Sequence, residues 1–201
     1  MAEDTFLTLS RPAESLYKEK GSKFIGLAYP ITSEEEVKEV LEDLRKTYYD
    51  ARHHCYAYII GAEGEKYRAN DDGEPNHSAG DPILGQIKSN ELTNTLVVVV
   101  RYFGGTKLGV SGLITAYKTA AADAIAASEI IEEVVKERLH IRYGYESTNE
   151  VMRLIKEYEL DILEQEFTAD CRMLLAVRQS FYPSLMEKLE MLEEVTMEEN
   201  S

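Results

Sequence analysis

The sequence is poor in cysteine, in long apolar runs and in basic residues, and each shortage argues against a class of protein. Its 201 residues include two cysteines, Cys55 and Cys171, which lie far apart and outside any CxxC motif. Neither a zinc site nor a disulfide framework is therefore expected. Unpaired cysteines are typical of a reducing compartment, so we expect a cytoplasmic protein.

Apolar residues never form a run long enough for a membrane span, which needs roughly 20 of them. The longest strongly apolar run, Leu96 to Val100, has the length of a strand, and the acidic start MAEDTFLTL lacks a secretory pattern. The 22 Lys and Arg against 37 Asp and Glu give a net charge of −15. This charge argues against tight non-specific binding of DNA or RNA, although a local basic surface remains compatible with it.

Hydrophobic periodicity predicts an alternation of strands and helices in the first part of the chain. We expect strands at 22–31, 53–60, 65–69 and 95–103, and helices at 33–49, 82–88 and 110–128. Ser33 and Glu36 have the spacing of a capping box. The continuous apolar run within 95–103 favours a strand that is buried on both faces.

The second part follows the order strand, helix, strand, strand, helix, strand. We expect strands at 135–143, 162–167 and 171–177, a helix capped by Ser147 and Glu150, and a helix near Pro183 before a short last strand. This βαββαβ order is typical of the ferredoxin-like fold. The sequence therefore predicts an α+β protein with domains at 1–130 and 131–201, and a disordered tail, EENS.

Five spaced motifs carry a resemblance to a known family. They are GSKF (21–24), ARHHCYAY (51–58), NDDGEP (70–75), AGDPIL (79–84) and VVRYFGGTKLG (99–109). With these motifs the first two-thirds of the chain resembles the IMPACT/YigZ family. The remainder is similar to the C-terminal domain of bacterial YigZ-like members in its order of elements. One departure is Asn76-His77-Ser78, where many bacterial members carry Ser-Gly-Thr.

The resemblance implies both a fold and a function. The first domain would have a ribosomal-protein-like α+β fold, akin to a domain of translation elongation factors. Eukaryotic relatives regulate translation under stress through protein contacts, and the bacterial type suggests association with nucleic acid or ribosomes. We therefore expect a non-enzymatic, translation-associated regulatory factor that contacts RNA, the ribosome or a translation-linked protein. No cofactor and no resident metal are expected.

The junction between strand 95–103 and the following helix is the first candidate site. Arg101 ends the strand, Gly104 and Gly105 permit a tight turn, and Lys107 precedes the helix. Free N–H groups at a helix N-terminus favour an anion, so these four residues could bind phosphate. The alternative is an ordinary tight connection whose glycines adopt positive φ.

A possible pocket combines His53 with the acidic loop residues Asp71, Asp72 and Glu74. Imidazole titrates near neutrality, so a small hydrolase or phosphate-handling enzyme that uses these groups with Arg101 and Lys107 is the alternative function. The sequence pairs no nucleophile with His53, and Cys55 on its buried strand fits a packing role. The acidic residues could equally cap local N–H groups of the loop.

A basic face is predicted on the second domain, where alternate residues of two neighbouring strands point outward. The candidates for RNA contact are Lys136, Arg138, Arg142 and Arg172. Open sheet faces of similar topology bind RNA, but they use stacking aromatics that are missing here. Glu164 and Glu166 could also neutralise part of this face. The alternative is therefore a solvated face with cross-strand ion pairs.

Overall fold

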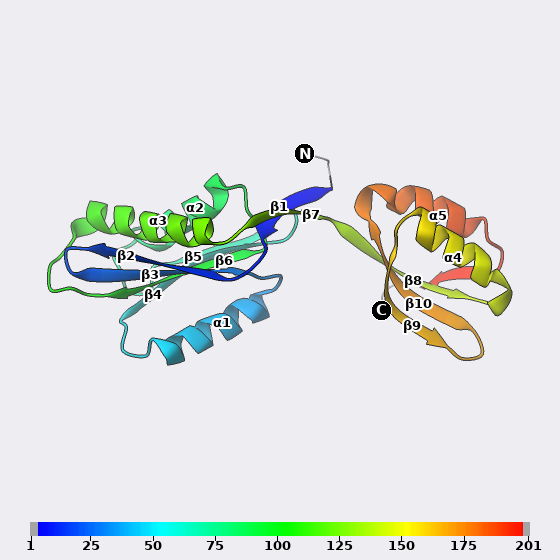
Figure 1. Ribbon diagram of the computed structural model, residues 1–201, viewed down its shortest axis with the longest axis horizontal. Coiled ribbons are helices and arrows are strands. Elements are labelled where there is room, and N and C mark those ends of the chain that lie inside the picture. Colours follow the sequence, from blue (N-terminus) through cyan, green and yellow to red (C-terminus); the bar gives the residue numbers. More distant parts are fainter. Residues whose placement is uncertain (1–3, 199–201) are drawn as a thin grey trace. The chain divides into compact units, whose positions relative to one another are not determined.

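The structure, a computed structural model, describes residues 4–198, and these form two compact units (Figure 1). The first unit is Phe6–Glu133; the second combines the residues up to Thr5 with the segment that begins at Val134. Both units combine helices with β-sheet, which confirms the predicted α+β class. The ranges 1–130 and 131–201 remain a prediction for independent domains, because strand β1 (Thr5–Leu9) begins in one unit and continues in the other.

The first unit is built on a five-stranded antiparallel sheet in the order β2-β3-β6-β4-β5. The strands are β2 (Ala13–Glu19), β3 (Ser22–Pro30), β4 (His53–Ile60), β5 (Lys66–Asn70) and β6 (Thr95–Tyr102). The apolar run of β6 occupies the centre and is buried on both faces, as predicted. The sequence prediction missed β2 and the separate two-stranded sheet of β1 with β7 (Ile130–Val134).

Helices cover both faces of this sheet. Helices α2 (Gly80–Ser89) and α3 (Gly109–Ala127) lie on one face and α1 (Glu34–Thr47) on the other (Figure 1). The Ser33 hydroxyl accepts the Glu36 N–H, as the capping box predicts, but the Glu36 carboxylate reaches the N–H and hydroxyl of Thr32 instead of closing on Ser33. Hydrophobic periodicity predicts an apolar stripe on α1, and the structure confirms it: the stripe residues Val37, Val40, Leu41, Leu44 and Tyr48 pack against the sheet core.

The second unit contains the predicted βαββαβ order. Its sheet, in the order β11-β8-β10-β9, comprises β8 (Lys136–Tyr143), β9 (Asp161–Phe167), β10 (Cys171–Arg178) and β11 (Val195–Glu198). Helices α4 (Thr148–Glu157) and α5 (Tyr182–Glu190) pack on its apolar face, where Leu139, Ile141 and Leu175 are buried. No helix within residues 4–198 is long and apolar enough to cross a membrane.

Two local predictions for the second unit need correction. Ser147 is the N-cap residue of α4, as predicted, but the predicted capping box is wrong, because the Ser147 side chain makes no capping hydrogen bond. The Thr148 hydroxyl instead donates to the carbonyl of Tyr145. Of the tail EENS, Glu198 ends β11, and the last three residues lie outside the described residues.

Candidate functional site

Two of the sequence motifs meet at the glycine junction that follows β6. The Gly104 N–H donates to the buried Ser22 hydroxyl at 3.1 Å, and a Cβ at Gly104 would lie 1.9 Å from the carbonyl carbon of Gly21. Gly21 and Gly105 adopt φ of +81° and +89°, which favours glycine. The glycines of GSKF and VVRYFGGTKLG therefore allow two backbone segments to touch and turn.

Arg101, predicted to bind phosphate at the junction, forms a buried ion pair instead. Its side chain is 7% exposed, and Nη1 donates to Glu74 Oε1 at 2.6 Å. The guanidinium carbon also lies 5.5 Å from the ring centre of Phe24 and 5.7 Å from that of Phe103. This leaves Lys107 as the exposed cation of the junction. Phosphate binding at Gly104, Gly105 and Lys107 stays a prediction. Arg101 is paired with Glu74.

Glu74 is the centre of a buried polar cluster. Its Oε1 accepts a hydrogen bond from the Tyr117 hydroxyl at 2.7 Å, in addition to that from Arg101, and lies 3.9 Å from His53 Nε2. His53 Nδ1 donates to the Asp72 carbonyl at 2.8 Å, which fixes the ring orientation. We call His53, Cys55, Glu74, Arg101 and Tyr117 the Glu74 cluster. It joins two strands, a loop and a helix.

The sequence prediction missed Tyr117 as a member of this cluster. Tyr117 lies on the stripe of small residues by which α3 packs on the sheet, and it is fully buried. A buried tyrosine hydroxyl usually has a hydrogen-bond partner. The position of Tyr117 in this buried stripe could therefore have indicated a polar partner in the core. Burial is the main reason that the pKa of Tyr117 is raised far above its usual value.

Cys55 contributes its thiol to the same cluster as a packing group. Its Sγ lies 3.0 Å from the Asp71 carbonyl oxygen and 3.4 Å from the Tyr117 hydroxyl oxygen, and the residue is fully buried. Burial raises the pKa of the Cys55 thiol far above its usual range. The thiol therefore remains protonated, whereas a nucleophilic cysteine requires the thiolate.

The adjacent carboxylates of the acidic loop bind backbone groups. Asp71 accepts N–H bonds from His77, Ala79 and Gly80 at 2.8, 3.1 and 2.8 Å, and thereby caps the start of α2. Asp72 Oδ2 accepts the His54 N–H at 2.7 Å. These two carboxylates therefore cap local backbone N–H groups, which is the alternative to a catalytic role. They hold the loop against β4 and α2.

His77 occupies a backbone position that suits glycine. Its φ is +64°, a left-handed conformation that costs most residues about 1–2 kcal/mol. His77 Nδ1 lies 2.6 Å from Oδ2 of Asp81, which is in the first turn of α2. This is the position at which the sequence departs from the Ser-Gly-Thr of many bacterial YigZ-like proteins, and the geometry explains why glycine suits it.

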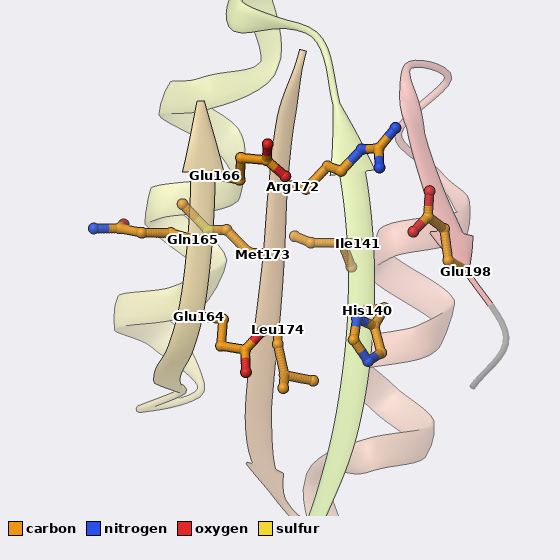
Figure 2. A pocket seen from close by; sticks show the side chains of 9 residues that line it. All are labelled: His140, Ile141, Glu164, Gln165, Glu166, Arg172, Met173, Leu174 and Glu198. Carbon is orange, nitrogen blue, oxygen red and sulfur yellow. The ribbon is translucent and has the colours of Figure 1, made fainter. Parts of the chain in front are cut away.

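The open face of the second sheet carries ion pairs. Lys136 pairs with Asp161, Arg142 pairs with Asp170, and Arg172 Nε lies 3.7 Å from the second oxygen of Asp170. Arg138 has no ion pair within residues 4–198. A shallow depression on this sheet is lined by His140 and by side chains of both charges, Arg172 with Glu164, Glu166 and Glu198 (Figure 2). The predicted basic face is therefore largely neutralised by carboxylates.

Comparison with known proteins places these features in a family. The Impact N-terminal domain matches residues 20–125, which is more than half of the chain. The chain belongs to the IMPACT family. IMPACT family member YvyE of Bacillus subtilis (strain 168) is 30% identical over 164 residues, which cover 82% of this chain and 76% of that protein. IMPACT family member YigZ of Escherichia coli (strain K12) is 36% identical over 116 residues, or 57% of each chain.

A solved structure extends the similarity to nearly the whole chain. The crystal structure of a protein described as hypothetical superposes with a TM-score of 0.76 at 25% identity and covers 98% of each chain. The glycine junction and the whole Glu74 cluster lie inside the segment that matches the Impact N-terminal domain. Residues of four motifs of this sequence, GSKF, ARHHCYAY, NDDGEP and VVRYFGGTKLG, therefore meet near the end of β6.

Of the residues predicted to share a pocket, the structure brings only some together. His53, Glu74 and Arg101 converge in the cluster of the IMPACT domain, with side-chain exposures of 23%, 4% and 7%. Asp71 and Asp72 lie next to them, but their carboxylates bind backbone N–H groups. Lys107 is exposed in the loop before α3, and among the described residues no ion pair joins it to the cluster.

Proposed function

We propose that this IMPACT-family chain is a non-enzymatic, translation-associated regulatory factor that acts by contacting a translation-linked protein. One observation carries the choice of protein over RNA: the basic side chains available for phosphate are mostly paired with carboxylates. Arg101 pairs with Glu74, and Lys136 and Arg142 pair with Asp161 and Asp170. Phosphate binding gains its free energy from cations that release counterions, and an internally paired cation contributes less.

The distribution of acidic residues supports the same choice. The open sheet face of the second unit carries Glu164, Glu166 and Glu198 among its cations, and the whole chain has a net charge of −15. Carboxylates on this face weaken its attraction for a phosphate backbone, whereas they can attract basic side chains of a protein. The link to translation comes from the family resemblance, and the charge pattern indicates the type of contact.

The Glu74 cluster favours a structural role over a hydrolase. Arg101 and Glu74 neutralise each other in a buried site, and burial raises the pKa values of the nearby Cys55 thiol and Tyr117 hydroxyl. A hydrolytic site needs a reactive nucleophile and a base that can reach a substrate. The cluster instead ties the acidic loop to the sheet and α3, and thereby shapes the surface of the domain.

Co-sedimentation tests whether the partner is protein or RNA. The full chain is incubated with intact ribosomes and, separately, with protein-free ribosomal RNA over a salt series. An Arg138→Glu/Arg142→Glu variant tests the open face, and Arg153→Glu/Lys156→Glu on α4 is the matched charge control. We expect association with ribosomes that changes by less than about twofold in both variants, because the phosphate contribution is small.

Two results would overturn this proposal. Salt-sensitive binding to protein-free RNA that is lost in Arg138→Glu/Arg142→Glu but kept in the α4 control would establish the open sheet face as an RNA surface. Failure of the wild-type chain to sediment with ribosomes at any salt concentration, together with no effect on a cell-free translation reaction, would remove the link to translation.

A further inference from the structure

Strand β9 forms an open edge of the second sheet. In the order β11-β8-β10-β9 it pairs with β10 on one side, and no strand within residues 4–198 pairs with its outer side. All seven residues of β9 are exposed. An edge of this kind presents a row of backbone N–H and C=O groups to which another extended segment can add as a further strand.

The side chains of β9 differ between its two faces. Glu164 and Glu166 lie opposite Leu174 and Arg172 on the open face of the sheet, whereas Gln165 and Phe167 belong to the other face. Figure 2 shows Glu164 and Glu166 reaching over the sheet toward β10, while Gln165 extends away from the edge. Phe167 is 54% exposed, so an apolar surface accompanies the acidic one.

The acidic groups of this edge are available to a partner. Glu164 and Glu166 form no ion pair or side-chain hydrogen bond with any residue in the described part of the chain, whereas Asp161 pairs with Lys136. Antiparallel pairing of β9 with β9 of a second copy would place like charges opposite each other, which destabilises a strand pair. The charge pattern therefore disfavours self-association and favours a segment of opposite charge.

A bulge limits where regular pairing can occur. The register of β9 with β10 shifts between Leu174 and Leu175, so that Leu163 has no partner residue on β10. Bulges bend and twist a strand and interrupt its ladder. The regular part of the edge is therefore residues 164–167, which contains both unpaired glutamates and Phe167.

We propose that residues 164–167 of β9 accept an extended basic segment of a partner protein as an added strand. Lys or Arg at every second position of that segment would face Glu164 and Glu166, and the intervening apolar side chains would lie on the side of Phe167. Backbone hydrogen bonds would supply affinity, and the charges would select the partner. The inference rests on the proposed function for its cellular context, since that function requires a protein partner.

A peptide titration tests the added strand directly. A fluorescent peptide of alternating Lys and Val is titrated with the full chain and followed by anisotropy, beside a Glu-Val peptide of equal length. A third Lys-Val peptide is N-methylated at every second residue on its pairing edge, which keeps the charge but removes backbone donors. We expect saturable binding of the first peptide, no binding of the second, and about tenfold weaker binding of the third.

Variants locate the binding edge. Glu164→Lys/Glu166→Lys should lower the affinity for the Lys-Val peptide by about tenfold. The control Glu187→Lys/Glu190→Lys on α5 has the same change of charge and should change this affinity by less than about twofold. Amide hydrogen exchange in β9 should slow when the peptide is bound, and exchange in β11 should not change.

Three results would overturn the proposal: no binding of the Lys-Val peptide, equal binding of the N-methylated peptide, or equal weakening by the β9 and α5 variants. The last two would indicate general attraction to an acidic protein. These peptides contain nothing specific to translation. Their failure would leave ribosome association and translation yield unaffected, so it is distinguishable from a failure of the proposed function.

Discussion

The carboxylate of Asp4 accepts two hydrogen bonds from the guanidinium of Arg178, although 174 residues separate them in the sequence. Nε and Nη2 of Arg178 donate to the two carboxylate oxygens at 2.7 and 2.8 Å, and the Ser180 N–H donates at 3.2 Å. Asp4 is thus part of the second unit. A fragment that begins at residue 131 would lack this carboxylate.

This arrangement predicts a pH-dependent contribution to stability. The hydrogen bonds from Arg178 and Ser180 hold the pKa of Asp4 well below its usual range. A depressed pKa in the folded state stabilises the protein above the pKa of the unfolded state, about 3.9, and this stabilisation is lost as the pH falls through the folded-state pKa. Asp4→Asn should therefore lower the urea midpoint at pH 7, and the difference from wild type should shrink below pH 4. A difference independent of pH would contradict this account; Asp43→Asn, at an exposed position, is the control.

The Glu74 cluster predicts a large effect of breaking one buried ion pair. Glu74→Ala leaves Arg101 buried without a counterion, which should lower the free energy of unfolding by about 3–5 kcal/mol. Glu74→Gln/Arg101→Met should be less destabilised than the sum of its single variants, because the two side chains are coupled. Urea denaturation of the four proteins measures this coupling. The exposed pair Lys46–Asp43 provides the control, and additive effects at Glu74 and Arg101 would refute the coupling.

The glycine junction predicts different effects for two neighbouring glycines. A Cβ at Gly104 would overlap the backbone of Gly21 and Ser22, whereas a Cβ at Gly105 would meet no atom within 4 Å. Gly105→Ala should therefore lower the free energy of unfolding by about 1–2 kcal/mol, because alanine is strained at positive φ. Gly104→Ala should cost more, because the two backbones must separate. Thermal denaturation of both variants gives the order, and equal losses would contradict the close approach.

The left-handed backbone of His77 predicts that glycine is preferred over alanine there. His77→Gly relieves the strain at φ +64° and loses a pair with Asp81 that is largely exposed, so we expect a gain of up to about 1 kcal/mol. His77→Ala keeps the strain and loses the same pair, so it should be less stable than wild type. Urea denaturation at pH 7 compares the three proteins, and a less stable glycine variant would refute the strain.

Local patterns in the sequence were sufficient to predict much of the fold. The apolar run of β6 and the stripe of α1 specify their elements by composition and period, and the order of the second unit follows in the same way. Strands β1 and β7 were missed because they are short and pair across more than 100 residues. Strand β2 was missed because it is a half-exposed edge strand with few apolar residues.

The candidate sites were harder to predict, because partners depend on tertiary structure. Arg101 has the sequence context of an exposed cation beside a glycine turn, and only folding places it against Glu74, 27 positions away. The sequence predicted that Glu164 and Glu166 could neutralise part of the basic face of the second domain. The strand register does place Glu166 opposite Arg172, but the carboxylate within ion-pair distance of Arg172 is Asp170 in the turn. Register can be predicted from a hairpin, whereas side-chain direction in a turn cannot.

The most direct test of the proposed function is translation itself. Purified full chain is added over a range of concentrations to a cell-free reaction that synthesises a reporter protein, beside the Arg138→Glu/Arg142→Glu variant. We expect the reporter yield to change with concentration, and to change equally for the variant, because the proposed contact is with a protein. A yield that stays constant at every concentration of the folded wild-type chain would contradict a role in translation, and an effect lost in the variant would contradict the protein contact.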